Sequence, residues 1–172
     1  MKKYLVIGNP IEHSLSPKLH NYWIKKNNLD AAYDKKRLNE SDIKGIIDEV
    51  KNGKIDGINV TVPFKKSVIP FLDKLTPLAN ETRSVNTIYK EKENAIDVVV
   101  GDNTDVGGFK QSLEYINYKV KNKKIFILGA GGVVPSILKA LEKLEAAKVY
   151  ISNRTKEKAK DLESYYKISL GL

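Results

Sequence analysis

The sequence predicts an α/β protein in two parts, because short apolar strands alternate with amphipathic helices along the chain. Residues 4–7 and 125–128 are continuous apolar runs, which are typical of strands buried in a sheet. Between them, residues 39–50 predict a helix with one apolar face, and Gly53 follows as a stop. Strands joined through helices usually pair in parallel, so we predict a mostly parallel sheet in the first part. The apolar face of that helix consists of Ile43, Ile46, Ile47 and Val50.

The first predicted helix begins with Ser16 as its N-cap and Pro17 at its first position. Leu19 and Trp23, four residues apart, would lie on its inner face. Ser16 therefore has a structural role, whereas no such role is evident for Ser14. Two hydroxyl groups beside unpaired helix N–H groups suit a carboxylate or a phosphate.

Residues 58–65 predict a strand that ends in a polar corner. Apolar side chains at positions 58, 60 and 62 alternate with polar ones at 59 and 61. Pro63 stops the strand because it has no N–H to give to a sheet. This corner can aim Thr61 and Lys65 into one cleft; the alternative is an ordinary strand followed by solvated lysines.

Residues 119–123 are charged and lack apolar periodicity, so we expect residues 1–118 to form one domain and residues 119–172 a second. Before this boundary the sequence predicts a helical segment at 66–72, interrupted by Pro70, and then a short helix capped by Thr76. A hairpin follows, with strands at 84–89 and 95–100 and a turn at 92–94. After it come a polar loop at 101–105, capped by Asp102, and a helix from 106 to about 117 whose inner face would be Phe109, Leu113 and Ile116.

The second part predicts the first half of a Rossmann-like dinucleotide-binding domain. The strand at 125–128 leads through a glycine turn, Gly129-Ala130-Gly131-Gly132, into a helix, and a strand at 149–151 follows. Glycines let the backbone approach a pyrophosphate, and the helix N-terminus offers N–H groups to it. The strict G-x-G-x-x-G pattern fails because residue 134 is valine, and the alternative is a tight turn that binds no ligand.

The end of the second strand of this part indicates the type of dinucleotide. Sites for NAD usually carry an acidic residue there, which would repel a 2′-phosphate. Here Asn153, Arg154 and Thr155 follow the strand, and Lys158 comes one turn later. An arginine pairs with a phosphate, so we predict NADP in preference to NAD. The alternative is a helix capped by Thr155, with Arg154 solvated.

Composition excludes several function classes. The net charge is +9, but only three of the 30 basic residues are arginines and the lysines are scattered. A nucleic-acid-binding protein should show a basic stripe interleaved with aromatic residues, so we predict no nucleic-acid partner. No apolar run is long enough for a membrane span. With no cysteine we expect no disulfide and no thiolate metal site, and we predict no metal and a cytoplasmic location.

Polar side chains stand at several predicted strand and helix ends, where they suit a small polyhydroxy acid. Hydroxyl groups would hold the carboxylate, and mixed donors and acceptors would hold the alcohols. A lysine–aspartate pair, Lys65 with Asp105, could manage the proton that leaves as a hydride passes to nicotinamide. Whether Lys65 acts as a base or as a hydrogen-bond donor stays open, because an ordinary lysine is a poor base near neutrality. The candidate residues are Ser14, Ser16, Thr61, Lys65, Asn86 and Asp105.

The chain resembles the shikimate dehydrogenase family from residue 4 to about residue 160. The resemblance rests on motifs in the order and spacing of that family: Gly8-Asn9-Pro10-Ile11, His13-Ser14-Leu15-Ser16-Pro17, Asn59-Val60-Thr61-Val62-Pro63-Phe64-Lys65, Val85-Asn86-Thr87, Gly101-Asp102-Asn103-Thr104-Asp105, Gly129-Ala130-Gly131-Gly132 and Asn153-Arg154-Thr155.

The resemblance implies NADP-dependent interconversion of shikimate and 3-dehydroshikimate, a step of aromatic amino-acid biosynthesis, by a monomer or homodimer. It implies that Ser14 and Ser16 hold the substrate carboxylate. Lys65 and Asp105 would be the catalytic pair, and Thr61, Asn86 and Asp105 would bind ring hydroxyls. The pyrophosphate would lie on Gly129, Ala130, Gly131, Gly132 and Val133, and the adenosine phosphate on Asn153, Arg154, Thr155 and Lys158.

The chain departs from the family pattern in three places. Arg83 and Ser84 stand where the family commonly has small residues, and residues 133–136 replace the usual alanines and arginine. After Lys123 only about 50 residues remain, whereas a dinucleotide domain uses about six strands, so we expect a partial chain with little or no turnover. The alternatives are a quinate/shikimate dehydrogenase that uses NAD, and a non-catalytic module that binds a small carboxylate.

Overall fold

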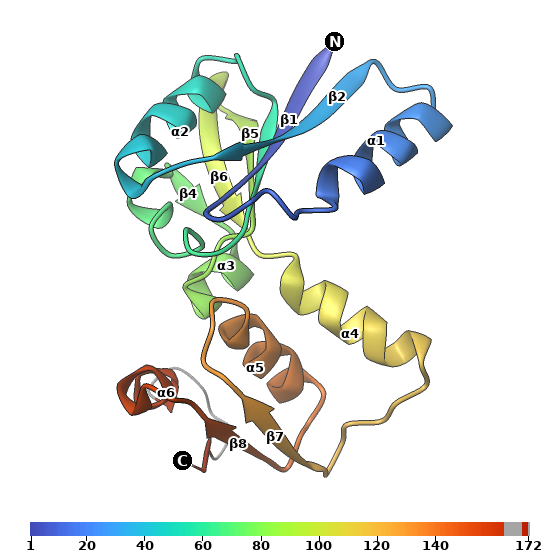
Figure 1. Cartoon of the computed structure of the whole chain (residues 1–172), viewed down its shortest axis with the longest axis vertical. Coiled ribbons are helices and arrows are strands. Elements are labelled where there is room, and N and C mark those ends of the chain that lie inside the picture. Colours follow the sequence, from blue (N-terminus) through green and yellow to red (C-terminus); the bar gives the residue numbers. More distant parts are fainter. Residues whose placement is uncertain (164–169, 172) are drawn as a thin grey trace.

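The computed structural model describes residues 1–163 and 170–171, which form an α/β protein with two sheets (Figure 1). The larger sheet has the strand order β2-β1-β3-β5-β6-β4, and the smaller one the order β7-β8-β9. The first comprises β1 Lys2–Gly8, β2 Ala31–Arg37, β3 Gly57–Val60, β4 Lys74–Leu75, β5 Thr87–Glu93 and β6 Ile96–Asp102, with helices α1 Ser16–Lys26, α2 Ile43–Lys51, α3 Pro77–Thr82 and α4 Asp105–Tyr115. The second comprises β7 Lys124–Leu128, β8 Lys148–Ser152 and β9 Leu170–Gly171, with α5 Val134–Lys143 and α6 Lys156–Glu163.

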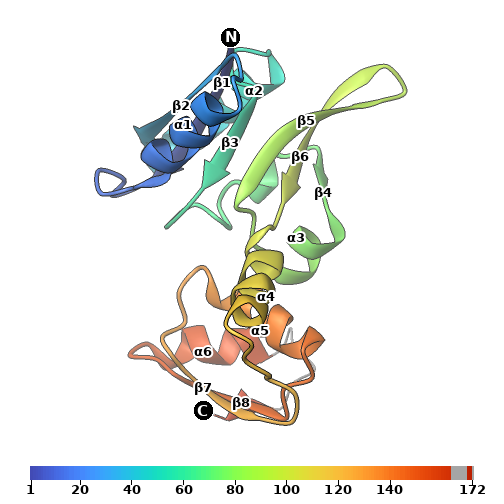
Figure 2. The same ribbon diagram turned by 90° about the vertical axis from the view of Figure 1, so that its right-hand side faces the viewer.

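The larger sheet is mostly parallel, as predicted. Strand β1 pairs in parallel with β2 and β3, and β4 pairs in parallel with β6, while β5 runs antiparallel between β3 and β6. Figure 2 shows α1 lying along β1 and β2, with the β5–β6 hairpin extending away from it. The carboxyl ends of β1 and β3 therefore lie at the same edge of the sheet, where the polar loops after them meet.

The helices α1 and α2 cover opposite faces of this sheet. Neighbouring residues of a strand point to opposite faces. In β1, Ile7 joins the core under α2, whereas Val6 packs with Tyr33 and Ile24 beneath α1. The predicted face of α2 is confirmed, since Ile43, Ile46, Ile47 and Val50 are all buried.

The prediction for α1 is wrong in detail. Leu19 and Trp23 are each 47% exposed rather than inward-facing, and every residue of the helix remains at least partly exposed. The helix begins at Ser16 with Leu15 in the cap position, so Ser16 is not its N-cap. The next strand, β2, was not predicted, because its sequence is mostly charged and only Tyr33 is buried within it.

Other element boundaries differ for local reasons. The strand predicted at 58–62 ends at Val60, and Val62 is exposed. The segment 66–72 contains a 3-10 turn, Ile69–Phe71, instead of an interrupted α-helix, because Pro70 denies the chain an N–H donor. The hairpin turns at Asn94 and Ala95, both with positive φ, so the turn begins at the end of the predicted segment 92–94 and extends one residue beyond it. The cap of α3 is confirmed, since Thr76 accepts a hydrogen bond from the Ala79 N–H.

The second sheet carries α5 on one face. Leu138 and Leu141 of α5 are buried against Val149 and Ile151 of β8. Strand β7 was predicted to be fully buried, and this is wrong: Phe126 is 63% and Leu128 is 81% exposed on the other face.

Helix α4 connects the two parts and runs beside α5 (Figure 1). Its Phe109 and Leu113 pack against the second core, as predicted for an inward face, whereas Ile116 is exposed. Val120, in the segment after α4, is buried in the same core. The domain boundary after residue 118 stays a prediction.

Candidate functional site

A lysine and an aspartate that are far apart in sequence meet at the edge of the larger sheet. The Lys65 Nζ lies 2.6 Å from the Asp105 Oδ2, and both side chains are largely buried, at 10% and 24% exposure. The turn that carries Lys65 follows β3, and its backbone is held by a hydrogen bond from the Val85 N–H to the Lys65 carbonyl. Asp105 is the first residue of α4, where a negative charge interacts favourably with the helix dipole.

The other oxygen of Asp105 is held by Asn86. The Asn86 Nδ2 donates to the Asp105 Oδ1 at 2.8 Å and to the Thr104 hydroxyl at 2.9 Å. The Asn86 Oδ1 accepts from the Thr104 N–H at 2.9 Å. Both N–H bonds of the Asn86 amide are thus engaged within the protein, so its observed contacts orient the aspartate. A direct contact of Asn86 with a substrate hydroxyl stays a prediction.

A hollow of about 270 Å³ is lined in part by three residues with hydroxyl groups, Ser14, Ser16 and Thr61. The Ser14 hydroxyl accepts a hydrogen bond from the Ser16 N–H at 3.3 Å, so Ser14 has the structural role that the sequence did not reveal. Thr61 is fixed from behind, since its N–H donates to the Ile7 carbonyl at 2.9 Å. Three hydroxyl groups in one hollow can hold a small carboxylate or alcohol.

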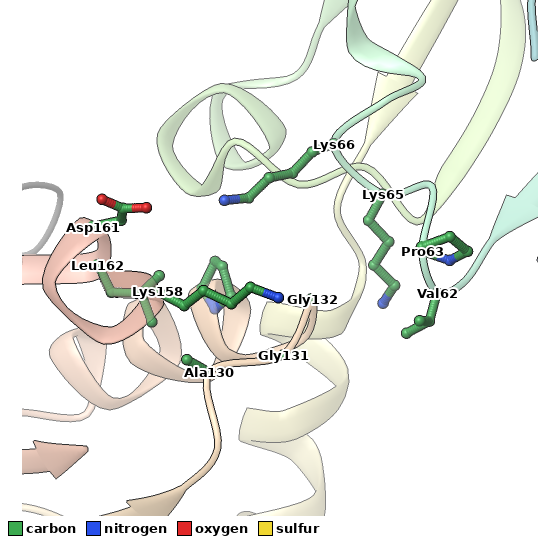
Figure 3. Close-up of a pocket in the computed structure, with 11 residues that line it drawn as sticks. Val62, Pro63, Lys65, Lys66, Ala130, Gly131, Gly132, Lys158, Asp161 and Leu162 are labelled. Carbon is green, nitrogen blue, oxygen red and sulfur yellow. The ribbon is translucent and has the colours of Figure 1, made fainter. Parts of the chain in front are cut away.

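A larger hollow, of about 420 Å³, lies between the turn that carries Lys65 and the glycine turn at 129–132. Figure 3 shows the Lys158 side chain extending along the glycine turn toward Gly132, with Lys65 and Lys66 on the opposite wall. A methyl group at Gly132 would lie 3.9 Å from the Lys65 Cδ, which shows how near the two turns are. The lining residues are Val62, Pro63, Lys65, Lys66, Ala130, Gly131, Gly132, Pro135, Lys158, Asp161 and Leu162.

The glycine turn is tied to the end of β8. Gly129 has a φ of +105° and donates its N–H to the Ser152 carbonyl at 2.7 Å. The Asn153 Oδ1 accepts from the Ala130 N–H at 3.1 Å. A side chain at Gly131 would meet no atom within 4 Å, so the backbone there is open to a ligand. An open glycine backbone, a helix N-terminus and a nearby lysine fit a dinucleotide pyrophosphate.

The remaining residues predicted for the cofactor lie around this turn. Arg154 and Thr155 are exposed just beyond β8, and the Asn153 Nδ2 donates to the Thr155 carbonyl at 2.7 Å. Val133 is 43% exposed in the cap position of α5. None of these four residues, Val133, Asn153, Arg154 and Thr155, lines the 420 Å³ hollow, so their roles stay predictions.

Sequence reasoning missed Asn103, whose side chain supports the lysine–aspartate pair. It is 1% exposed and accepts a hydrogen bond from the Asp105 N–H at 3.1 Å. Asn103 stands within the Gly101–Asp105 motif, but its burial depends on contacts with distant elements that spacing does not reveal. Asp102 caps the loop as predicted, since its Oδ1 accepts from the Asn103 N–H at 2.7 Å and the Thr76 hydroxyl at 2.6 Å.

Residues 1–163 and 170–171 contain neither a cluster of metal-binding side chains nor a membrane-spanning helix. In this part of the chain, no three histidine or acidic side chains gather closely enough to hold a metal ion. No helix in it is long and apolar enough to cross a membrane.

Two stretches of the chain match known protein families. Residues 6–88 match the family described as shikimate dehydrogenase substrate binding domain, and residues 111–170 match shikimate / quinate 5-dehydrogenase. The chain belongs to the shikimate dehydrogenase family. The two matched stretches contain the turn with Lys65 and the glycine turn.

Curated relatives agree with this family assignment. The NADP(+) shikimate dehydrogenase of Pelagibacter ubique is 56% identical over 165 residues, which cover 96% of this chain and 61% of that protein. That of Aquifex aeolicus is 45% identical over 156 residues, which cover 91% of this chain and 56% of that protein. The chain therefore spans about 60% of the length of the shikimate dehydrogenases it matches.

Solved structures of the family have the same fold. A crystal structure of shikimate dehydrogenase from Aquifex aeolicus matches with a TM-score of 0.89 and 41% sequence identity. The match covers all of this chain and 63% of the solved chain. The Thermus thermophilus enzyme, solved in complex with NADP(H) and shikimate, matches with a TM-score of 0.87 at 28% identity. This match also covers all of this chain and 63% of the solved chain. The predicted fold class, an α/β domain followed by part of a Rossmann-like domain, is confirmed.

Proposed function

We propose that this chain is the substrate-binding part and the nucleotide-turn part of an NADP-dependent shikimate dehydrogenase. Such an enzyme interconverts shikimate and 3-dehydroshikimate, a step toward aromatic amino acids. The observation that carries the proposal is the 2.6 Å contact between Lys65 and Asp105, beside a hollow shared with the glycine turn. We take residues 1–118 as the substrate domain and residues 119–172 as part of the cofactor domain.

The substrate would be held by two sets of groups. Ser14 and Ser16 would bind its carboxylate through their hydroxyl groups, and Thr61 in the same hollow would bind a ring hydroxyl. Asn86 and Asp105 would bind further hydroxyls at the other end of the ring. A hydroxyl that reaches both Lys65 and Asp105 would be the one oxidised, because this pair can hold its proton.

The pair would handle charge and proton together. Bound NADP⁺ would supply the acceptor for the hydride that leaves the carbon bearing this hydroxyl. The hydroxyl proton passes to the Lys65–Asp105 pair, and the Lys65 ammonium stabilises the negative charge that develops on the oxygen. In the reverse direction the same pair returns the proton to the oxygen. The Lys65 side chain is only 10% exposed, so little water screens its charge. The charge therefore interacts strongly with groups that lie close to it.

The cofactor would lie along the glycine turn. The pyrophosphate would lie along Gly129, Ala130, Gly131, Gly132 and Val133. The last three would donate their N–H groups to it, because the N–H groups of Gly129 and Ala130 already donate to Ser152 and Asn153. Asn153, Arg154 and Thr155 would hold the phosphate of the adenosine half. Lys158 was predicted for the same phosphate, but it lines the hollow beside the glycine turn, so we assign its charge to the pyrophosphate instead (Figure 3). NADP is favoured over NAD because no acidic residue follows β8 at this point. A cytoplasmic location and a monomeric or homodimeric state stay predictions.

Calorimetric titration of the 172-residue chain with shikimate tests the proposal. We expect weak but measurable binding that Lys65→Ala weakens at least tenfold, since it removes a charge-assisted hydrogen bond from a largely buried site. Lys44→Ala is the control, because Lys44 is exposed on α2 and lines neither hollow. Equal affinities of the wild type and Lys65→Ala for shikimate, or no binding by the wild type, would overturn the proposal.

Two further titrations separate the alternatives. Quinate in place of shikimate, and NAD in place of NADP, would identify a quinate/shikimate dehydrogenase that uses NAD if either were preferred. We expect shikimate and NADP to bind more tightly.

A further inference from the structure

We propose that Asn103 is a positioning residue for Asp105, and that Ser136 links this positioning to helix α5 of the nucleotide part. Both side chains are buried, Asn103 at 1% and Ser136 at 0% exposure. The Asn103 Nδ2 lies 2.9 Å from the Ser136 Oγ, across 33 positions of sequence. This contact joins the loop before α4 to the first turn of the helix that follows the glycine turn.

The acceptor end of the Asn103 amide holds the start of α4. Its Oδ1 accepts from the Asp105 N–H at 3.1 Å and from the Val106 N–H at 3.3 Å. These N–H groups have no partner within a helix, so a side-chain oxygen that accepts from them fixes where the helix begins. Because Asp105 is the first residue of the helix, Asn103 determines where its carboxylate emerges beside Lys65.

The donor end of the amide fixes which way the side chain points. The Asn103 Nδ2 donates to the Ser84 carbonyl at 2.8 Å. With the amide reversed, its oxygen would face that carbonyl oxygen and its NH₂ would face the Asp105 N–H, which leaves both pairs unsatisfied in a buried site. The observed orientation is therefore the one that serves Asp105.

Ser136 is the partner that reaches Asn103 from the nucleotide part. Its Oγ lies 2.9 Å from the Asn103 Nδ2 and 3.3 Å from the Asn103 Oδ1, so this hydroxyl can accept from one and donate to the other. An ion pair of 3.0 Å between Lys139 and Glu81 holds the same helix against α3. A shift of α5 would thus move Asn103, and with it the carboxylate of Asp105.

The test compares Ser136→Ala with Ser84→Ala. Both changes delete a fully buried hydroxyl at the junction of the two parts, but the Ser84 hydroxyl contacts the Gly132 carbonyl instead of Asn103. Ser136→Ala leaves Asn103 with the Ser84 and Thr82 oxygens as acceptors, so we expect it to fold. Asn103→Ala, which removes the positioning group itself, is the stronger variant if it folds.

NMR of the labelled chain gives the readout. We expect Ser136→Ala to shift the Asp105 backbone N–H and carboxyl resonances and to speed hydrogen exchange of the Asp105 N–H, while Ser84→Ala leaves them near wild type. Because the inference rests on the proposed function, we also expect Ser136→Ala to weaken shikimate binding about 2- to 10-fold, the usual effect of one lost hydrogen bond. Asp105 resonances that are the same in the two variants would overturn the inference. Failure of the wild type to bind shikimate would overturn the proposed function alone.

Discussion

The Lys65 ammonium and the Asp105 carboxylate lie 2.6 Å apart, although 40 positions separate them in the sequence. Two loops at one edge of the larger sheet bring them together: the turn after β3 and the loop between β6 and α4. Strand β5 lies between β3 and β6 and sets their spacing, and Asn86 just before it bonds to both, through Val60 and Asp102. The order of the strands in the larger sheet therefore brings Lys65 and Asp105 into contact.

The two members of this pair should contribute unequally to stability. Asp105→Ala leaves the Lys65 ammonium largely buried without its carboxylate, so we expect a loss of about 1–3 kcal/mol in the free energy of unfolding. Lys65→Met keeps the volume and removes the buried charge, so its cost should be below about 1 kcal/mol. Urea denaturation measures both. An equal loss for the two variants would mean that burial of the lysine is not what makes the aspartate necessary.

Gly8 should be required for close packing between the first loop and the corner after β3. A Cβ at this position would lie 2.7 Å from the Thr61 Cγ2 and 3.0 Å from both the Ile11 Cδ1 and the Val62 carbonyl oxygen. We expect Gly8→Ala to cost about 1–3 kcal/mol by overpacking and to displace Thr61, which weakens shikimate binding.

Gly45→Ala is the control for this change. Gly45 lies within α2, and a Cβ there would meet no atom within 4 Å. We expect this variant to be more stable by about 0.5–1 kcal/mol, because alanine favours a helix and restricts the unfolded chain. Denaturation curves of the two variants that shift in the same direction would contradict the packing argument.

Local patterns predicted much of this fold. The face of α2, the cap of α3, the β5–β6 hairpin and the strand–turn–helix at the glycine turn follow from periodicity and turn chemistry within a few residues. Strand β2 could not be found in this way, because an edge strand with one buried residue carries little apolar signal. The exposure of Phe126 depends on what covers the second sheet, which a strand pattern does not encode.

The site was predictable to a similar extent. Polar residues at strand ends, together with a family resemblance, indicated Lys65 and Asp105 as a pair, and the structure brings them into contact. The structural role of Ser14 and the burial of Asn103 were missed, since each depends on the exact course of the backbone. Ser136 stood out as a departure from the family, but its partner could be known only from the packing of α5.

Asp73 should contribute stability that is lost in acid. The Val99 N–H donates to its carboxylate at 2.9 Å, and Lys51 lies 2.9 Å from the other oxygen. The hydrogen bond from Val99, and then that from Lys51, hold the pKa of Asp73 below its ordinary value of 3.8. Because the folded-state pKa is lowered, the stabilisation is fully present above the ordinary, unfolded-state pKa of 3.8. It is lost as the pH falls through the lower folded-state pKa.

We therefore expect Asp73→Asn to cost about 1 kcal/mol at pH 7 and to differ little from the wild type well below pH 3.8. Asp48→Asn is the control, because it removes an exposed ion pair to Lys44 within one helix and should cost less than about 0.5 kcal/mol. Denaturation at several pH values measures both. A difference between wild type and Asp73→Asn that persists unchanged in acid would rule out the charge as its source.

Arg154 should determine the preference for a 2′-phosphate. It is exposed just beyond β8, where Asn153 ties the chain to the glycine turn, so its guanidinium can reach a phosphate on the adenosine ribose. We expect Arg154→Ala to weaken binding of adenosine 2′,5′-bisphosphate about 5-fold, since an exposed charge contact contributes about 1 kcal/mol. Binding of adenosine 5′-phosphate, which lacks the 2′-phosphate, should stay unchanged. Lys156→Ala, which removes a nearby exposed charge, serves as the control in the same titrations. If both ligands lost affinity equally with Arg154→Ala, the arginine would be contributing general positive charge, and the preference for NADP would have to arise from another residue.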